Sequence, residues 1–272
     1  DASAALAQRA PLDLTIKDVG ETADWATTLG GESLAPGHVR LAADSDVAKL
    51  PGFDEGAWWV QGLAASVPAR LFGAGEGRSI LDLCAAPGGK TAQLILAGAE
   101  VTALDQSGSR LRRLKGNLKR LGLEAETKEV NMADFQPETL FDAALLDAPC
   151  SSTGTTRRHP DVLWTKGPED IEKLADLQER LLRHALTVVK PGGTVVFSNC
   201  SLDPREGEEV VARVIGSGES YERVPISATD WPGLEDAITP IGEMRTTPAM
   251  LPLEAPFSSG LDGFYAAVIR RK

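Results

Sequence analysis

Short apolar runs alternate with helical patterns in the chain from about residue 66 onward. Four runs predict buried strands, at residues 79–83, 101–104, 141–146 and 194–198. Between them lie two stripes of apolar residues at helical spacing: Leu111, Leu114, Leu118 and Leu121, and then Ile171, Leu174, Leu181 and Leu182. Strands that alternate with helices form βαβ units. The pattern therefore predicts a doubly wound α/β fold with a mostly parallel sheet.

The first 65 residues show a different pattern. They contain a strand candidate at 12–17, a helical piece at 21–29, and turns at Gly30-Gly31, Pro36-Gly37 and Pro51-Gly52. A segment of this length is too short to enclose a large core of its own. We therefore predict two domains, a small α+β subdomain at residues 1–65 and the α/β domain at residues 66–272.

Composition narrows the class of protein. The 272 residues are 42% hydrophobic and 25% charged, as in ordinary globular proteins. No apolar run approaches the roughly 20 residues that cross a bilayer, and the opening DASAALAQRAPLDL, which lacks an initial methionine, has no signal-peptide pattern. Three cysteines without a C-x-x-C pair indicate neither a disulfide scaffold nor a zinc site. We expect a cytoplasmic protein with reduced thiols, no metal and no membrane partner.

The formal net charge of −11, from 28 basic and 39 acidic residues, argues against a polyanionic partner. The charge is unevenly distributed, however. Residues 1–60 carry four bases and ten acids, whereas residues 105–128 carry seven bases and three acids. Because a local basic patch can bind phosphate groups whatever the global charge, a nucleic acid stays a candidate partner.

The first strand of the α/β domain runs into LDLCAAPGGKTAQL at residues 81–94. A proline-glycine-glycine turn precedes a helix that begins near Lys90, and backbone N–H groups at a helix start suit an anionic or electron-rich ligand. A nucleotide P-loop needs glycine where Cys84 stands, and a dinucleotide fingerprint needs G-x-G-x-x-G. The pattern favours a third interpretation, an S-adenosylmethionine loop that follows Asp82 on the first strand.

Further acids follow the later apolar runs. Asp105 lies 17 residues after Gly88, where a carboxylate can bind ribose hydroxyls. We expect Asp134, after the next stretch, to reach an adenine, and Asp147 ends the run FDAALLD. A single acid in such a position is more often a helix cap. Three acids in register, together with the glycine turn, favour a cofactor site.

Cys150 and Cys200 each follow a predicted strand, in DAPC and SNCS. Both thiols should therefore lie over the carboxyl edge of the sheet, close to the glycine loop. A thiolate in a ligand cleft is a candidate nucleophile if its pKa is lowered. Cys84 instead fits a small-residue position inside the loop, as a small buried hydrophobe. A disulfide between Cys150 and Cys200 is the alternative for that pair.

Together these motifs resemble the RsmB/Sun family of RNA 5-methylcytosine methyltransferases. The resemblance covers roughly residues 58–272 and is carried by WWVQGLAASVPARLF, CAAPGGKT, DAPCSSTGTTRRHPD, NCSLDPREGEEVV and DGFYAAVIRRK, with a looser echo in RAPLDL. Two positions depart from the family pattern: Gly62 stands where Asp is usual, and Asn199 stands where Thr is common.

The resemblance implies a seven-stranded, Rossmann-like methyltransferase sheet with S-adenosyl-L-methionine as its cofactor. The residues that it assigns to the cofactor are Cys84, Ala85, Ala86, Pro87, Gly88, Gly89, Lys90, Asp105, Asp134 and Asp147. It also implies three catalytic residues: Cys200 as the nucleophile, Cys150 assisting product release, and Asp147 binding the cytosine edge.

The implied reaction is methyl transfer to C5 of a cytosine in structured RNA, with small-subunit ribosomal RNA as the favoured substrate. C5 of cytosine is a poor nucleophile until a thiolate adds at C6, which explains the need for a cysteine. The base must leave its stack to reach such a pocket. We predict RNA contacts from Arg157, Arg158 and His159, which follow Cys150, with the basic stretch 110–120 as a second candidate.

Three alternatives stay open. The substrate is a transfer RNA in the first, and DNA in the second, where Cys150 would be the nucleophile. In the third the chain is a non-catalytic RNA-binding factor for ribosome assembly. We expect a monomer. Since relatives often carry an extra N-terminal domain, residues 1–65 are interpreted as the remnant of a longer RNA-binding region.

Overall fold

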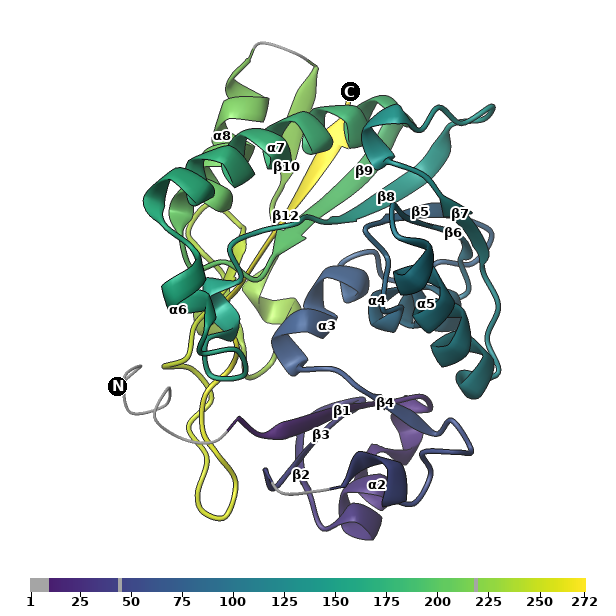
Figure 1. The fold of residues 1–272 in the computed structure, drawn as a ribbon, viewed down its shortest axis with the longest axis vertical. Helices are drawn as coiled ribbons and strands as arrows, with labels where there is room; N and C mark the ends of the chain where they lie inside the picture. Colours follow the sequence, from purple (N-terminus) through teal and green to yellow (C-terminus); the bar gives the residue numbers. More distant parts are fainter. Residues whose placement is uncertain (1–9, 44–45, 218–219) are drawn as a thin grey trace.

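The computed structural model describes residues 10–43, 46–217 and 220–272 (Figure 1). Its larger sheet has seven strands in a row in this part of the chain. Their order is β10 (Tyr221–Val224), β12 (Phe264–Arg271), β9 (Val189–Asn199), β8 (Phe141–Asp147), β5 (Ser79–Leu83), β6 (Glu100–Asp105) and β7 (Glu126–Glu129). An eighth, three-residue strand, β11 (Met244–Thr246), pairs with β12 off this row.

The five strands from β9 to β7 pair in parallel, while β12 and β10 are antiparallel. Leu83 at the end of β5 lies opposite Leu104 of β6 and Leu146 of β8. The predicted doubly wound, mostly parallel sheet is confirmed. Its order changes direction between β5 and β8, and ligands of such sheets bind at the carboxyl ends of the strands beside this point.

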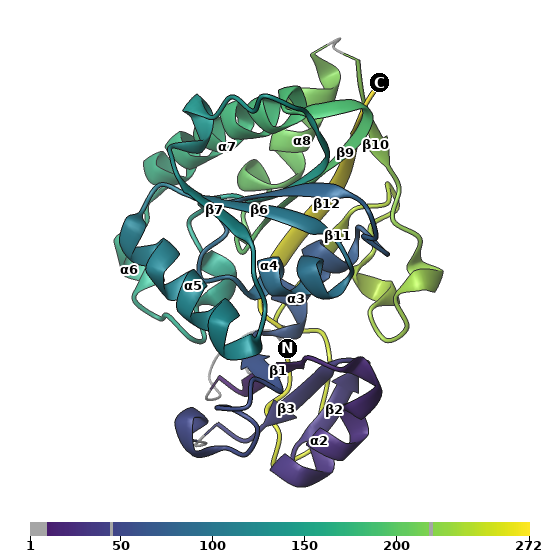
Figure 2. The same ribbon diagram turned by 90° about the vertical axis from the view of Figure 1, so that its right-hand side faces the viewer.

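Helices cover both faces of this sheet (Figures 1 and 2). Side chains alternate along β5, so that Leu81 joins the core under two helices and Ile80 joins the core on the opposite face. The helices of the first face are α7 (Pro168–Thr187) and α8 (Glu208–Gly216), and those of the second are α3 (Leu63–Arg70), α4 (Gly89–Leu96) and α5 (Gly108–Leu121). None of the helices in the described ranges is long and apolar enough to span a membrane.

The predicted leucine stripe forms the buried side of α5: Leu111, Leu114, Leu118 and Leu121. Ser107 caps its first turn by accepting a hydrogen bond from the Arg110 N–H, and Gly122 ends it in the left-handed region at φ 66°. The remaining short elements are α6 (Val162–Thr165) and the 3-10 turns η1 (Val19–Glu21), η2 (Val47–Lys49), η3 (Met132–Asp134), η4 (Thr153–Thr155), η5 (Pro204–Glu206), η6 (Ala228–Asp230) and η7 (Glu235–Ala237).

A second, antiparallel sheet lies at the N-terminal end, as the α+β prediction requires. Its order is β2 (Glu32–Ala35), β3 (His38–Leu41), β1 (Leu12–Ile16) and β4 (Trp58–Val60), and α2 (Thr22–Leu29) packs against it. Residues 1–9 of the predicted subdomain lie outside the described residues. The boundary at 65–66 falls inside α3, and the division into two domains stays a prediction.

A buried arginine ties the small sheet to the C-terminal segment. Arg40 is 1% exposed and its Nε lies 2.7 Å from Oδ1 of Asp13. Its Nη1 donates to the carbonyls of Ser258 and Gly260 at 2.7 and 2.9 Å. In Figure 1 this C-terminal loop, drawn in yellow, runs down beside the small sheet. The contact holds the small sheet against the larger domain next to the carboxyl-end loops.

Candidate active site

The loop after β5 has the backbone of a ligand cradle. Cys84 adopts φ 61° and Gly88 φ 102°, and the Gly88 N–H donates to the carbonyl of Ala85 at 2.9 Å before α4 begins at Gly89. A side chain at Gly88 would combine this strained φ with a Cβ placed 3.0 Å from Cγ of Leu114. Glycine is therefore required at this turn.

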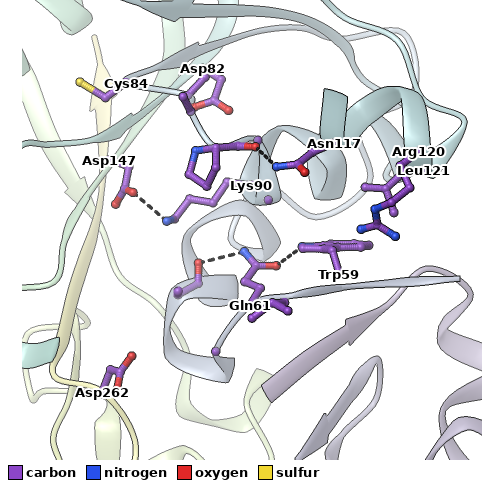
Figure 3. A pocket seen from close by; sticks show the side chains of 18 of the residues that line it. Trp59, Gln61, Asp82, Cys84, Lys90, Asn117, Arg120, Leu121, Asp147 and Asp262 are labelled. Atoms are coloured by element: carbon purple, nitrogen blue, oxygen red, sulfur yellow. Dashed lines mark hydrogen bonds and ion pairs between the residues drawn. The ribbon is translucent and has the colours of Figure 1, made fainter. Parts of the chain in front are cut away.

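Two cavities flank the loop, and Cys84 lines both of them. The larger, of about 550 Å³, lies between the loop, α5 and the small sheet, and Figure 3 shows side chains that line it. Its residues include Trp59, Gln61, Asp82, Lys90, Asn117, Arg120, Asp147, Arg158, His159 and Asp262. The smaller, of about 110 Å³, is lined by Asp105, Arg110, Asn131, Met132, Pro149 and Leu177 among others.

Each cavity contains a buried carboxylate with an open oxygen. Asp82 accepts a hydrogen bond from the Thr91 hydroxyl at 2.6 Å through Oδ2, while its Oδ1 has no partner. Burial raises the pKa of Asp82 to about 7. Asp105 accepts from the Ser107 N–H at 3.0 Å through Oδ1; its Oδ2 lies 3.3 Å from Nη1 of Arg110 but makes no hydrogen bond. A ligand that carries N–H or O–H donors would satisfy both.

Asp147 and Lys90 form an ion pair that lines the larger cavity. Lys90 Nζ lies 2.8 Å from Oδ2 of Asp147, whose Oδ1 accepts from the Ser198 hydroxyl at 3.0 Å. Figure 3 shows the two side chains pointing toward one another across the space between β8 and α4. The pair is partly exposed, so that both charged groups are accessible to a ligand.

The structure brings Cys150 and Cys200 together, with their Sγ atoms 3.5 Å apart and no disulfide between them. The Ser152 hydroxyl lies 3.5 Å from Sγ of Cys200 and 3.8 Å from Sγ of Cys150. The hydrogen bond from Cys150 lowers the pKa of Cys200, and the same bond, with burial, holds the pKa of Cys150 well above its ordinary value. Within the pair, Cys200 is therefore the thiol that loses its proton more readily, and Cys150 is the one that retains its proton more tightly.

Two charged groups on neighbouring elements act on the Cys200 thiol. Asp147 raises the pKa of Cys200 and Lys90 lowers it. Cys84 differs from the pair, because burial raises the pKa of its thiol to about 12. We therefore expect Cys84 to have a structural role in the loop.

The predicted RNA-binding residues occupy unequal positions. Arg157 is half-buried and donates from Nη1 to the carbonyl of Ser259 at 2.6 Å. Arg158 Nε lies 3.0 Å from Oδ2 of Asp262, and both residues line the larger cavity. His159 lines the same cavity and is exposed. The two arginine side chains thus bind the C-terminal loop. Of the three predicted RNA-binding residues, only His159 has an exposed side chain.

Asp134 is exposed and lines neither of the two cavities. It ends the turn η3, whose neighbouring residues Asn131 and Met132 line the smaller cavity instead. Sequence reasoning also missed Glu206, a fully buried carboxylate beside the cysteines. Nothing in the pattern DPREGEE distinguishes Glu206 from the acids around it.

The fold and the loop site define a Rossmann-like methyltransferase domain. The structure is similar to that of a methyltransferase homolog protein from Pyrococcus horikoshii, with a TM-score of 0.74 and 25% identity, over 100% of this chain and 90% of that chain. It is also similar to NSun6 from Pyrococcus horikoshii, solved with SFG, with a TM-score of 0.68 and 27% identity, over 84% of this chain and 56% of that chain.

Residues 70–270 match the family model of the 16S rRNA methyltransferase RsmB/F, and the chain belongs to this family. The ribosomal RNA small subunit methyltransferase B of Vibrio vulnificus is 38% identical over 254 residues, which is 92% of this chain and 55% of that protein. The chain thus spans about half the length of the curated relatives it matches. The resemblance seen in the sequence motifs is confirmed.

Proposed function

We propose that this chain is the catalytic part of an S-adenosylmethionine-dependent RNA (cytosine-C5) methyltransferase that modifies small-subunit ribosomal RNA. The observation that carries the proposal is the pair of thiols 3.5 Å apart, one of lowered pKa, at the sheet edge that also holds the glycine loop and the open carboxylates of Asp82 and Asp105. Relatives named as small-subunit ribosomal RNA methyltransferases support the choice of RNA. We further propose that the protein is a monomer in the cytoplasm.

The residues around the loop fit S-adenosylmethionine, which supplies an electrophilic methyl group when it is bound. Asp105 would accept hydrogen bonds from the ribose hydroxyls through its open Oδ2, and Asp82 would accept from the ammonium group through its open Oδ1. The backbone of the loop 84–90 would contact the rest of the methionine moiety. Asn131 and Met132 would line the adenine position in place of Asp134.

Cys200 is the residue that activates the cytosine in this proposal. Its sulfur forms a bond to C6, and the ring electrons that this addition releases make C5 nucleophilic enough to accept a methyl group. The C5 proton then leaves to a base, the C6–S bond breaks, and Cys200 departs as a thiolate. The Cys150 sulfur lies 3.5 Å from this sulfur, and its raised pKa suits a thiol that assists the release of the product.

Asp147 would recognise the edge of the cytosine. A carboxylate oxygen can accept a hydrogen bond from the N4 amino group, which uracil lacks. Because Lys90 lies 2.8 Å from Oδ2 of Asp147, the lysine orients this carboxylate and balances its charge beside the Cys200 thiolate. The ion pair is thus a positioning element for both the base and the nucleophile.

The exposed side of α5 would supply phosphate contacts. The helix contains no acidic residue. Four of its basic side chains form no ion pair within the described ranges: Arg112, Arg113, Lys115 and Lys119. The same helix borders the larger cavity through Asn117 and Arg120. In a chain of net charge −11 such a face suits the RNA backbone.

Bisulfite sequencing of total RNA from cells with and without the gene tests the proposed function. Loss of one 5-methylcytosine from small-subunit ribosomal RNA is the expected result. If a 5-methylcytosine disappears from transfer RNA instead, transfer RNA is the substrate of the enzyme. An unchanged methylation pattern, with a protein that releases no heat when S-adenosylmethionine is added, would contradict the enzyme and support an assembly factor.

A further inference from the structure

A buried carboxylate connects the two cysteine loops. Glu206, at the end of η5, is 0% exposed. Its Oε1 accepts hydrogen bonds from the backbone N–H of Ser151 at 2.8 Å and from Nε2 of Gln178 at 3.0 Å. Its Oε2 accepts from the hydroxyl of Ser201 at 2.6 Å and from the hydroxyl of Ser151. One side chain thus collects four donors.

Three of these four hydrogen bonds come from residues next to a candidate catalytic thiol. Ser151 directly follows Cys150, and Ser201 directly follows Cys200. The two serine hydroxyls lie 3.0 Å apart. Gln178 adds a third tie, because its Nε2 also donates to the carbonyl of Pro149 at 2.8 Å. The positions of both sulfur atoms therefore depend on the same carboxylate.

Stability alone does not explain a carboxylate in this place. All four partners of Glu206 are neutral donors, so that no positive charge compensates its removal from water through these bonds. Burial of a carboxylate costs, roughly, several kcal/mol of folding free energy. Proteins in which apolar residues of similar volume replace such buried charged groups are often equally stable or more stable. A buried carboxylate in contact with both cysteine loops indicates a role in the site.

We propose that Glu206 is a positioning residue that fixes the 3.5 Å contact between the two sulfurs and so makes Cys150 the hydrogen-bond donor to Cys200. The inference rests on the proposed function for the reaction that the thiols serve. Electrostatics act in the same direction: the hydrogen bond with Cys200 and burial raise the pKa of Cys150 most, and the negative charge of Glu206 raises it further. A thiol that retains its proton can stabilise the neighbouring thiolate.

The test is Glu206→Gln, which keeps the shape of the side chain and removes its charge. The alkylation rate of each cysteine by iodoacetamide is measured from pH 6 to 10 by peptide mass spectrometry, without RNA or cofactor. We expect Cys200 in Glu206→Gln to react at least about five-fold more slowly at pH 7, because its thiolate loses the donor. Cys150 should ionise at lower pH. With RNA, kcat should fall while KM for RNA is unchanged.

Glu209→Gln is the matched control, since Glu209 is an exposed acid three residues farther along. Ser201→Ala removes one hydrogen bond to Glu206 and should lower the alkylation rate of Cys200 by at least about two-fold. If Glu206→Gln does not fold, Ser201→Ala is the variant that tests the inference. Wild-type alkylation profiles for both cysteines in a folded Glu206→Gln, or for Cys200 in Ser201→Ala, would overturn the inference. Because alkylation needs no methyl transfer, an inactive wild-type protein would refute the proposed function alone.

Discussion

Replacing Asp82 by asparagine should stabilise the ligand-free protein at pH 8 and weaken its binding of S-adenosylmethionine. Asp82 is 1% exposed, and burial raises the pKa of its carboxyl from 3.8 to about 7. The difference of about three pH units corresponds to about 4 kcal/mol, at roughly 1.36 kcal/mol per unit. Asparagine avoids this cost of burying a charge. Its amide N–H, however, would occupy the position of Oδ1, which has no hydrogen-bond partner, and an unsatisfied buried donor costs about 1–3 kcal/mol. A net gain of about 1–3 kcal/mol remains.

The gain should depend on pH with a definite sign. Since the folded protein holds the Asp82 proton more tightly than the unfolded chain, it binds more protons between pH 3.8 and about 7. The stability of the wild type therefore falls as the pH rises through this window. The advantage of Asp82→Asn should be absent below pH 4 and complete above pH 7. Because an ammonium group binds an ionised carboxylate more strongly than a protonated one, we expect the affinity for the cofactor to rise over the same pH range.

Guanidinium denaturation at pH 4 and pH 8 measures the first effect, and calorimetric titration of S-adenosylmethionine at pH 8 measures the second. We expect cofactor binding to weaken at least about tenfold in Asp82→Asn, since a hydrogen bond between charged groups contributes about 1.5–3 kcal/mol. Asp134→Asn, in an exposed acid outside both cavities, is the control and should change neither quantity. A stability difference that is equal at the two pH values, or an Asp82→Asn protein with wild-type affinity, would refute the reasoning.

Two further predictions concern the ligands. Asp105→Asn should weaken S-adenosylmethionine binding about tenfold or more in the same titration, because the open Oδ2 loses its charge; an unchanged affinity would remove Asp105 from the ribose site. Replacing Arg112, Arg113, Lys115 and Lys119 together by glutamine should lower RNA affinity and reduce the slope of log K against log salt by up to about 0.7 for each phosphate that the helix no longer neutralises. The cofactor affinity of this variant should be unchanged, and an unaltered salt slope would make α5 an ordinary solvated helix.

The sheet and most of the site could be predicted from the sequence because both depend on local patterns. A buried parallel strand is a continuous apolar run, and the carboxyl ends of such strands share one edge. Asp147 is the last residue of β8, Cys150 lies three residues beyond it, and Cys200 directly follows β9, so their meeting at that edge required only the strand order. The stripe of leucines indicated the buried face of α5 for the same reason.

The remaining residues depend on contacts that no local pattern records. Arg157 and Arg158 follow a site motif, but their partners Ser259 and Asp262 lie about a hundred residues further along the chain. The place of Asp134 after a strand predicts a cofactor contact, whereas the turn η3 leaves Asp134 exposed and Met132 lines the cavity. Glu206 gains its importance only where the two cysteine loops converge on it.

The central claim is that the sulfur of Cys200 bonds to the cytosine ring. The most direct measurement is a denaturing gel with mass spectrometry of the protein after incubation with small-subunit ribosomal RNA and S-adenosylmethionine, for Cys150→Ala and for Cys200→Ala. We predict that Cys150→Ala accumulates a covalent protein–RNA complex through Cys200, and that Cys200→Ala forms none and transfers no methyl group. A covalent complex that forms through Cys150 in the Cys200→Ala protein would contradict this account.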